Sequence, residues 1–414
     1  MDYHTLSKEE LIAHINELEN KPYGLVWEKR EEFIPQNITL RHNHEHHILK
    51  AQGQPTHTLI EGENLYALTL LKKHIYDSLD VICFVPPYFT RNNDLRYTDN
   101  FSSNKKNQFK YSEWINFMYH RLVIAKDLLK QDGFIAVHID EKMHPYLQLL
   151  MNDIFGESNF VSDITWQNKY GRANDKKTIS SLTEYILIYA KNQKNIQFAR
   201  TALNQEYVNK TYKNHDNDKR GAWRTSQLYK DKNQKSYKVT SPCGVEWEKP
   251  WNVTPETFVK LAYDNRIWWG KDGTAQPRKK IFLAESNGQV EINLWTGKEY
   301  GYVGDGKTEL EKWIPLKGKF LYPKPVQLEK KILSLHPNKN AKIMDFFAGS
   351  GTLGQAVMEL NEEDGGKREC LLITNNENNI FDEITYPRLR NVIESRGFKE
   401  NWLCYHLEHE KDPL

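Results

Sequence analysis

The fold is decided by the stretch Asp345-Phe346-Phe347-Ala348-Gly349-Ser350-Gly351-Thr352-Leu353-Gly354. The segment that leads into this glycine turn, residues 342–347, is mostly apolar and predicts a strand, and residues 352–360 predict a helix after it. Glycines at such a turn let the backbone approach a nucleotide-like ligand closely, and the start of the helix offers free N–H groups. This spacing suits several nucleotide-binding enzymes, nicotinamide-dependent oxidoreductases among them, and also a plain strand–helix turn.

Strands and helices are expected to alternate along the chain around this motif. Short apolar runs predict buried strands at 57–60, 81–85, 134–139 and 370–374. Apolar residues at helical spacing predict a short N-terminal helix and helices at 64–75, 111–129, 143–155 and 387–395. This alternation predicts an α/β fold with a doubly wound, mostly parallel sheet.

The alternation stops between residues 192 and 317, where Lys, Asn, Trp, Gly and turn signals predict an inserted domain of mixed structure. Within it, residues 210–238 carry nine Lys or Arg against three acids, with four Tyr or Trp between them. Phosphate neutralisation combined with stacking surfaces is typical of nucleic-acid binding, although a solvated face has the same composition. The candidate DNA-binding residues are Lys210, Lys213, Lys219, Arg220, Arg224 and Lys230.

Length and composition limit the number of domains and the class of protein that can be expected. A chain of 414 residues suggests two or three domains, and 39% hydrophobic with 27% charged residues is typical of a soluble globular protein. The net charge of +2 indicates no particular partner. A polar N-terminus argues against a signal peptide, and no apolar run approaches about 18 residues, so no membrane span is expected.

Cysteine and histidine spacing does not predict a metal site. Cys83, Cys243, Cys370 and Cys404 lie far apart and form no Cys-x-x-Cys pair. This spacing argues against a disulfide framework or a zinc site and favours a reducing, cytoplasmic setting. Four histidines between residues 42 and 47 have no cysteine near them, so a surface loop is expected there and no metal is predicted.

A second motif, Val85-Pro86-Pro87-Tyr88, stands at the end of the expected strand at 81–85. Two prolines fix the backbone and remove two N–H donors, which leaves carbonyl groups as acceptors. Tyr88 adds an aromatic stacking face. Such a site suits a flipped-out base, which stacks on a ring and donates its amino protons, but a rigid turn with a core Tyr would have the same sequence.

Together the two motifs resemble the Asp-Pro-Pro-Tyr and Phe-x-Gly-x-Gly hallmarks of amino-methylating DNA methyltransferases. Their order is that of the β class, in which a target-recognition domain lies between them. More closely, the chain resembles the modification subunits of type III restriction–modification systems, over nearly its whole length. Further stretches that carry the resemblance are residues 1–3, 23–27, 59–64, 114–119, 132–135, 184–191, 266–273 and 375–380.

The resemblance implies a Rossmann-like fold that uses S-adenosyl-L-methionine to methylate adenine in double-stranded DNA. It implies a homodimer and a restriction (helicase–nuclease) subunit as partners. The implied domains are an N-terminal helix and arm (1–56), a catalytic half (57–191), a target-recognition insert (192–317) and a cofactor-binding half (318–414).

The family pattern also assigns roles to single residues. Pro86, Pro87 and Tyr88 would hold the target base at the catalytic motif that begins with Val85. Glu377 would hold the cofactor's ribose, and the segment Tyr322-Pro323-Lys324-Pro325 would close over its methionine end. The expected cofactor pocket is lined by Asp345, Phe346, Phe347, Gly349, Gly351, Glu377, Lys324 and Pro325.

One departure from the pattern bears on activity, because position 85 is Val where the family has Asp. In the family, the Asp carboxylate and a proline carbonyl accept both amino protons and localise the lone pair of the nitrogen. Loss of such a polar group costs about 100–1000-fold, and loss of a proton acceptor up to about 10²–10⁴-fold more. Asp80 is separated from Val85 by about 17 Å of extended chain, so it is not expected to substitute. Methyl transfer is therefore expected to be impaired.

Residues after the motif depart in part from the pattern as well. Phe89 and Arg91 stand where the family often has Asn and Gly, whereas Thr90 and Asn92 fit. Three alternatives stay open besides an active adenine methyltransferase. They are a catalytically inactive recognition subunit that still binds DNA and cofactor, a methyltransferase acting on cytosine's amine or a glutamine amide, and a nicotinamide-dependent oxidoreductase.

Overall fold

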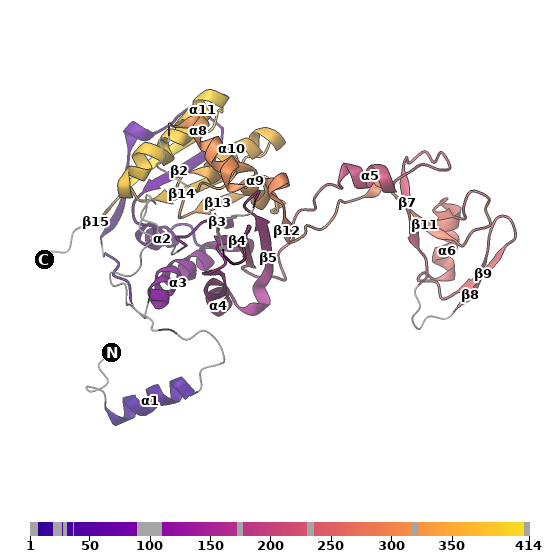
Figure 1. The fold of residues 1–414 in the computed structure, drawn as a ribbon, viewed down its shortest axis with the longest axis horizontal. Helices are drawn as coiled ribbons and strands as arrows, with labels where there is room; N and C mark the ends of the chain where they lie inside the picture. The colour runs from indigo at the N-terminus through magenta and orange to yellow at the C-terminus, as the bar shows by residue number, and fades with distance from the viewer. Residues whose placement is uncertain are drawn as a thin grey trace. The chain divides into compact units, whose positions relative to one another are not determined.

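A ten-stranded sheet forms the centre of the larger of two compact units in the computed structural model (Figure 1). The structure describes residues 7–19, 27, 31–35, 37–88, 110–171, 177–229, 236–315 and 322–409. The first unit comprises Met1–Ala199 and Ile292–Leu414, and the second comprises Arg200–Glu291. None of the helices in the described ranges is long and apolar enough to cross a membrane.

The strands of this sheet follow one another in an order far from their order in the chain. The order is β1 (Ile38–His42), β15 (Asn401–His409), β2 (Thr56–Glu61), β14 (Glu369–Thr374), β13 (Lys342–Asp345), β3 (Leu79–Phe84), β4 (Leu129–Ile139), β6 (Thr183–Ala190), β5 (Phe160–Gln167) and β12 (Leu294–Trp295). From β15 to β4 every neighbouring pair is parallel, whereas β1, β6 and β5 add antiparallel pairs at the two sides. The predicted α/β, doubly wound, mostly parallel sheet is therefore confirmed.

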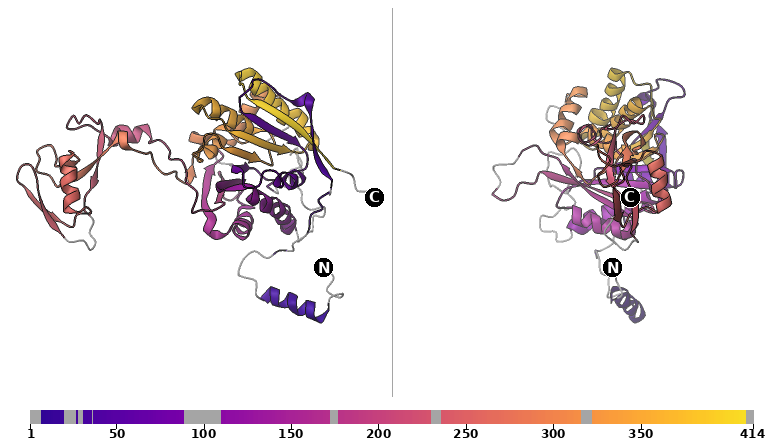
Figure 2. Two further views of the ribbon diagram at one scale, coloured as in Figure 1. Left: turned by 180° about the vertical axis from the view of Figure 1, so that it is seen from behind. Right: turned by 90° about the vertical axis from the view of Figure 1, so that its right-hand side faces the viewer.

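Helices cover both faces of the sheet (Figures 1 and 2). On one face lie α2 (Asn64–Lys72), α3 (Lys110–Leu128) and α4 (His144–Phe155), whose apolar side chains share one core cluster. On the other lie α9 (Val326–Ser334), α10 (Thr352–Asp364) and α11 (Tyr386–Arg396), which contribute to a second cluster. Because both faces are covered, every residue of β3 is buried, which explains its uninterrupted apolar run.

The predicted elements differ from the observed ones mainly at the sides of the sheet. The expected strand at 342–347 ends at Asp345, because the glycine turn begins at Phe346. The strands β1, β5, β6 and β15 were not predicted. Two further helices of the first unit, α7 (Gly297–Tyr300) and α8 (Val303–Trp313), fall within the segment expected to be inserted. The N-terminal helix α1 spans Lys8–Glu19.

The second unit is smaller than the expected insert of residues 192–317. It holds α5 (Gln205–Thr211), α6 (Pro255–Tyr263), the antiparallel sheet of β7 (Trp223–Gln227), β11 (Arg278–Phe282) and β10 (Ile267–Trp268), and the hairpin of β8 (Tyr237–Thr240) and β9 (Glu246–Lys249). Its own small core includes Trp251, Phe258 and Ile267. Residues 292–315 belong to the first unit, where β12 pairs with β5.

Candidate active site

The two sequence motifs meet at one edge of the central sheet. β13 and β3 are parallel neighbours, with Met344 opposite Ile82, so the residues that follow both strands lie at the same edge. The ring of Phe84 contacts the rings of Phe346 and Phe347, with centroids 4.2 and 5.4 Å apart. The glycine turn and the Pro-Pro-Tyr segment are therefore brought together although about 260 residues separate them in the chain.

Val85 lines three cavities at this edge. One, of about 240 Å³, is also lined by Pro87, Phe346, Phe347, Gly349 and Glu377, and so combines both motifs. A larger one, of about 1070 Å³, is lined by Tyr88, Asp140, Asn168, Glu184 and Lys324. A small one, of about 60 Å³, is lined by Asp345, Glu329 and Lys324. After the ligands that the family resemblance implies, we call the first the nucleoside cavity and the second the base cavity, and we call the third the small cavity.

The nucleoside cavity has a wall that sequence reasoning did not assign. Asn64, at the start of α2, donates from Nδ2 to the Phe346 carbonyl at 2.8 Å. Its Oδ1 accepts from Nε of Arg121 at 2.7 Å, and Arg121 also pairs with Glu63 at 2.7 Å. The buried Arg121 thus ties α3 to the cavity wall. The stretch 59–64 belonged to the resemblance, but no local pattern gives Asn64 this role.

The glycine turn has the backbone that its sequence predicts. Gly349 and Gly351 have φ of 50° and 73°, in the left-handed region that favours glycine. The Gly351 N–H donates to the Ala348 carbonyl at 2.7 Å, and Gly351 is the N-cap of α10. Gly349 lines the nucleoside and small cavities, whereas Gly351 lines neither and acts only through the conformation of the turn.

Asp345 is buried at the end of β13 and lines the small cavity. Its Oδ1 accepts the Phe347 N–H at 2.8 Å. Burial, together with the nearby Glu329 carboxylate, raises the pKa of Asp345 well above its usual value. Glu377, the residue expected to hold the ribose, lines the nucleoside cavity. It lies at the start of a 3₁₀ turn (Glu377–Asn379).

The Pro-Pro-Tyr segment offers fewer free acceptors than expected. Trp114 Nε1 donates to the Pro87 carbonyl at 2.8 Å, so that carbonyl is already engaged. Among the contacts of the described residues, the Pro86 carbonyl has no such donor. Asp80 is buried at the opposite end of β3, where it pairs with Lys130 at 2.9 Å and accepts the Lys342 N–H at 2.7 Å. Asp80 therefore does not substitute for a carboxylate at position 85, as expected.

Glu184, on β6, is a carboxylate that contacts Tyr88. Its Oε2 accepts from Lys324 Nζ at 2.5 Å and from the Tyr88 hydroxyl at 3.3 Å, and its Oε1 accepts from Asn168 Nδ2 at 2.9 Å. Burial opposes ionisation, but the Lys324 charge and the bonds from Lys324 and Asn168 outweigh it and hold the pKa of Glu184 below its usual value. The base cavity thus contains an ionised, fully engaged carboxylate.

Lys324 was expected at the methionine end of the cofactor. The structure places it in the base and small cavities, with Nζ 5.0 Å from the Tyr88 ring centroid. Pro325 is the N-cap of α9, and its carbonyl accepts the Leu328 N–H at 3.1 Å. Neither residue lines the nucleoside cavity.

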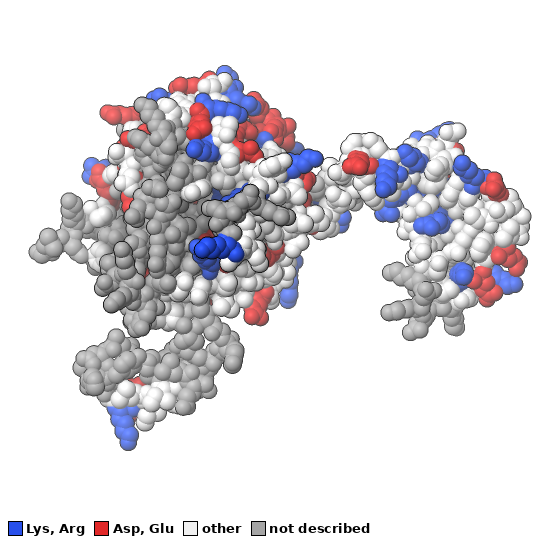
Figure 3. Space-filling model, viewed as in Figure 1, with Lys and Arg blue, Asp and Glu red and all other residues white. Residues whose placement is uncertain are grey.

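The candidate DNA-binding residues lie in the second unit, and they are not equivalent. Lys210, Lys213 and Lys219 are exposed, and Figure 3 shows Lys and Arg side chains on the face of this unit that includes α5. Arg220 instead pairs with Asp218 at 2.7 Å and with Asp264 at 3.1 Å, and Arg224 donates to the Tyr212 hydroxyl at 3.2 Å. The remaining candidate, Lys230, lies outside the described residues, as do residues 89–92, 1–3 and 23–26 of the sequence patterns.

Comparison with known proteins identifies the family. The model of the N6/N4 DNA methylase family matches residues 79–385, a range that contains both motifs. This chain belongs to the N6/N4 DNA methylase family. The resemblance drawn from the two motifs is thereby confirmed.

Several curated relatives of this methylase are modification enzymes. It is 33% identical over 388 residues to the type III restriction-modification enzyme StyLTI Mod subunit of Salmonella typhimurium, covering 84% of this chain and 58% of that one. It is 27% identical over 453 residues to the EcoPI Mod subunit of Escherichia phage P1, covering 91% and 69%. It is 29% identical over 343 residues to the type II methyltransferase M.KpnI of Klebsiella pneumoniae, covering 76% and 79%.

Solved structures similar to this methylase are more distant. A DNA modification methylase from Thermus thermophilus, complexed with S-adenosyl-L-methionine, is 13% identical with a TM-score of 0.42, covering 85% of this chain and 100% of that one. The PvuII DNA methyltransferase, which is cytosine-N4-specific, is 12% identical with a TM-score of 0.41, covering 83% and 95%.

Proposed function

We propose that this methylase binds S-adenosyl-L-methionine and directs it at the exocyclic amine of adenine in double-stranded DNA. The observation that carries the proposal is the position of Val85, which lines both the nucleoside cavity and the base cavity. A group transferred between ligands in these two cavities would pass position 85. We therefore expect the side chain at position 85 to affect the rate of transfer.

The residues of the nucleoside cavity fit the proposed cofactor. Phe346 and Phe347 supply apolar and aromatic surface, and Glu377 supplies a carboxylate of the kind that holds ribose hydroxyls. The small cavity adjoins it, because Val85, Phe347 and Gly349 line both. When bound, S-adenosyl-L-methionine supplies an electrophilic methyl group on a sulfonium. The protein's part is to orient the amine and to remove its protons.

An amine substrate needs a stacking face and two acceptors for its amino protons, and the base cavity supplies the stacking face. The Tyr88 ring, held by its hydroxyl bond to Glu184, offers a stacking face. The Pro86 carbonyl, next to Val85 in the chain, is the proposed acceptor of one amino proton, although Pro86 is not among the residues that line the three cavities. Val85 cannot accept the second, and Glu184 is already bonded to Lys324 and Asn168. We therefore propose that the transfer is slow in this chain.

The second unit is the proposed DNA-reading element, because Lys210, Lys213 and Lys219 expose positive charge there. By the names of its relatives, we further propose that the chain is the modification component of a restriction–modification system. A restriction subunit is a proposed partner because these relatives are named as subunits of restriction-modification enzymes. A second copy is proposed on the family resemblance alone. Because the chain spans 58% of the length of the StyLTI Mod subunit, these are properties to be tested on the chain itself.

The test is methyl transfer from labelled S-adenosyl-L-methionine to mixed-sequence duplex DNA, with the unmodified chain and Val85→Asp side by side. We expect Val85→Asp to be at least about 100-fold faster, since it restores a preorganised acceptor at the reacting amine. Digestion of the labelled DNA to nucleosides then distinguishes methylated adenine from methylated cytosine. Equal rates in the two proteins would contradict the role given to position 85.

A second candidate function, a catalytically inactive recognition subunit, is favoured by Val85 itself. Both candidate functions require cofactor binding, which calorimetry measures. Absence of binding would instead show that the cofactor site is wrongly assigned. A chain that binds cofactor and DNA but transfers no methyl group, and that gains transfer in Val85→Asp, acts as a recognition subunit. A chain and a Val85→Asp variant that both fail to bind cofactor would overturn the proposed function.

A further inference from the structure

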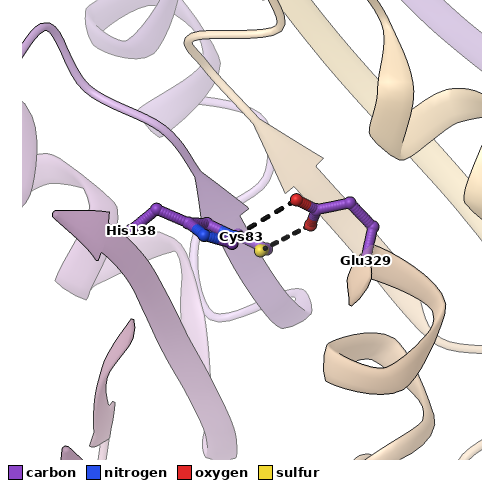
Figure 4. Close-up of side chains that lie close together, drawn as sticks. All are labelled: Cys83, His138 and Glu329. Carbon is purple, nitrogen blue, oxygen red and sulfur yellow. Dashed lines mark hydrogen bonds and ion pairs between the residues drawn. The ribbon is translucent and has the colours of Figure 1, made fainter. Parts of the chain in front are cut away.

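Three side chains of different chemistry converge behind the catalytic motif, where the sequence predicted no metal site. Cys83 comes from β3, His138 from β4 and Glu329 from α9 (Figure 4). Their exposed fractions are 0%, 0% and 3%, so the cluster is closed to bulk water. Glu329 Oε2 lies 3.3 Å from Cys83 Sγ, and Glu329 Oε1 lies 3.1 Å from His138 Nε2. One donor atom from each residue lies within 4.8 Å of the others.

The contacts of the histidine in this cluster are incomplete: Nε2 forms an ion pair with Glu329, and no described residue bonds Nδ1. Among the described residues, neither ring nitrogen of His138 has a hydrogen-bond partner of acceptable geometry. Nε2 is close to Glu329 but does not direct its N–H at the carboxylate. A buried polar atom without a partner is rare in proteins and needs an explanation, of which a bound ion is one. Two ligands of one metal ion also lie close together without hydrogen-bond geometry, since each directs a lone pair at the ion and not at the other ligand.

A second buried Cys–His–Glu group in the same sheet provides a comparison. His57 accepts the Cys370 backbone N–H at Nδ1, 3.1 Å away, and Nε2 lies 3.2 Å from Glu400. Both ring nitrogens are therefore used by the protein. Glu400 is further bonded to Asn361 Nδ2 at 2.6 Å. The same residue types form a closed network there, which leaves no donor for an ion.

We infer that Cys83, His138 and Glu329 bind a divalent transition-metal ion of the Zn²⁺ type. Thiolate, imidazole and carboxylate are the three ligand classes that Zn²⁺ takes in proteins. At zinc bond lengths in a tetrahedral site, ligand atoms lie roughly 3.3–3.5 Å apart. The two contacts run to different oxygens of Glu329, 3.1 Å from Oε1 to His138 Nε2 and 3.3 Å from Oε2 to Cys83 Sγ, so the carboxylate would turn to present one oxygen to the ion. This proposal differs from the sequence prediction of no metal site, which rested on the wide cysteine spacing.

Charge and access fit the same assignment. Binding requires the Cys83 thiol to lose its proton to solvent, after which thiolate and carboxylate together balance the charge of the ion with His138 neutral. Glu329 also lines the small cavity, which gives the cluster a route of entry. Three protein ligands leave one coordination position open, as in zinc sites that accept a further ligand. The ion would link β3, β4 and α9. Its ligand on β3, Cys83, lies two residues before Val85.

The first experiment measures metal in the purified full-length chain by plasma mass spectrometry after dialysis, followed by titration of the metal-free protein with Co²⁺. We expect about one tightly bound ion per chain and a thiolate-to-Co²⁺ absorption band. Cys83→Ala should abolish the band, and Glu329→Gln should weaken Co²⁺ binding more than about 10-fold. Cys370→Ala, at the closed group, should leave both unchanged.

Two controls keep the outcome decisive. His44→Ala removes one of the clustered surface histidines, so unchanged Co²⁺ affinity in that variant excludes adventitious binding there. Cys83→Ser serves if Cys83→Ala fails to fold, since it removes the sulfur while keeping the volume close. A metal-free protein that gives no thiolate band with Co²⁺ overturns the inference and leaves a hydrogen-bonded cluster. A band that survives in Cys83→Ser, for example from the exposed Cys243, also overturns it.

Discussion

Lys324 donates a 2.5 Å hydrogen bond to Glu184, a residue 140 positions earlier in the chain. This pair joins the Pro-Lys-Pro segment before α9 to strand β6, and Tyr88 donates to the same carboxylate oxygen at 3.3 Å. Tyr88, the proposed stacking residue, therefore contacts this ion pair through its hydroxyl. Both members are largely buried, with side-chain exposures of 4% and 14%. A pair of this kind is expected to respond strongly to the loss of one partner.

Replacing Glu184 by Gln is expected to destabilise the protein by about 3–5 kcal/mol, because it leaves the Lys324 ammonium buried without a counter-charge. Combining Glu184→Gln with Lys324→Met should recover most of that loss. Urea unfolding of the single and double variants measures both values. As a control, Glu408→Gln breaks a surface pair with Arg41 and should cost about 0–1 kcal/mol. Equal stability of the single and double variants would contradict the coupling.

The same pair predicts a pH dependence. The pKa of Glu184 is lowered in the folded protein, so its stabilising contribution is present above the ordinary value of 4.5 and is lost as pH falls through the folded pKa. The stability difference between the unmodified chain and Glu184→Gln should therefore be constant near neutral pH and shrink below about pH 4.5. Thermal unfolding across this range tests it. A difference that persists at lower pH would show that the lost charge is not the cause.

Local patterns were sufficient for the centre of the fold and for the meeting of the two motifs. The buried run of β3 and the glycine turn after β13 are properties of contiguous residues, and because the two strands are parallel neighbours, their carboxyl ends lie at one edge of the sheet. The observed φ of 73° at Gly351 is what a glycine at that position indicates. These parts of the site could therefore be predicted from sequence.

The rest depends on pairings between distant segments. Glu184 reaches Tyr88 because β6 pairs antiparallel with β4, with Leu187 opposite Val137, and no local pattern encodes that register. Cys83, His138 and Glu329 come from three elements whose side chains meet only in the folded sheet. Cysteine spacing along the chain carried no sign of this cluster. Such contacts are products of tertiary structure, which explains why they could not be predicted from the sequence.

The two ends of α10 provide a matched test of the glycine turn. Gly351 and Gly365 cap this helix with φ of 73° and 67°, and an alanine at either should cost about 1–2 kcal/mol in the left-handed conformation. Only Gly351→Ala is expected to weaken cofactor binding, because only Gly351 belongs to the turn at the nucleoside cavity. Unfolding and calorimetric binding of both variants measure this. Equal cofactor affinity in the two variants would argue against the turn as a cofactor site.

Exposed lysines of the second unit are expected to set the salt dependence of DNA binding. Each of Lys210→Ala, Lys213→Ala and Lys219→Ala should reduce the slope of log K against log salt by about 1, if the side chain contacts a phosphate. Arg220→Ala should mainly lower thermal stability, because Arg220 pairs with Asp218 and Asp264 within the unit. Lys339→Ala, a 59%-exposed lysine of the first unit, is the control for a nonspecific loss of charge. If it changes the slope as much as the three lysines do, the second unit is not the DNA-binding element, because charge anywhere on the protein would then have the same effect.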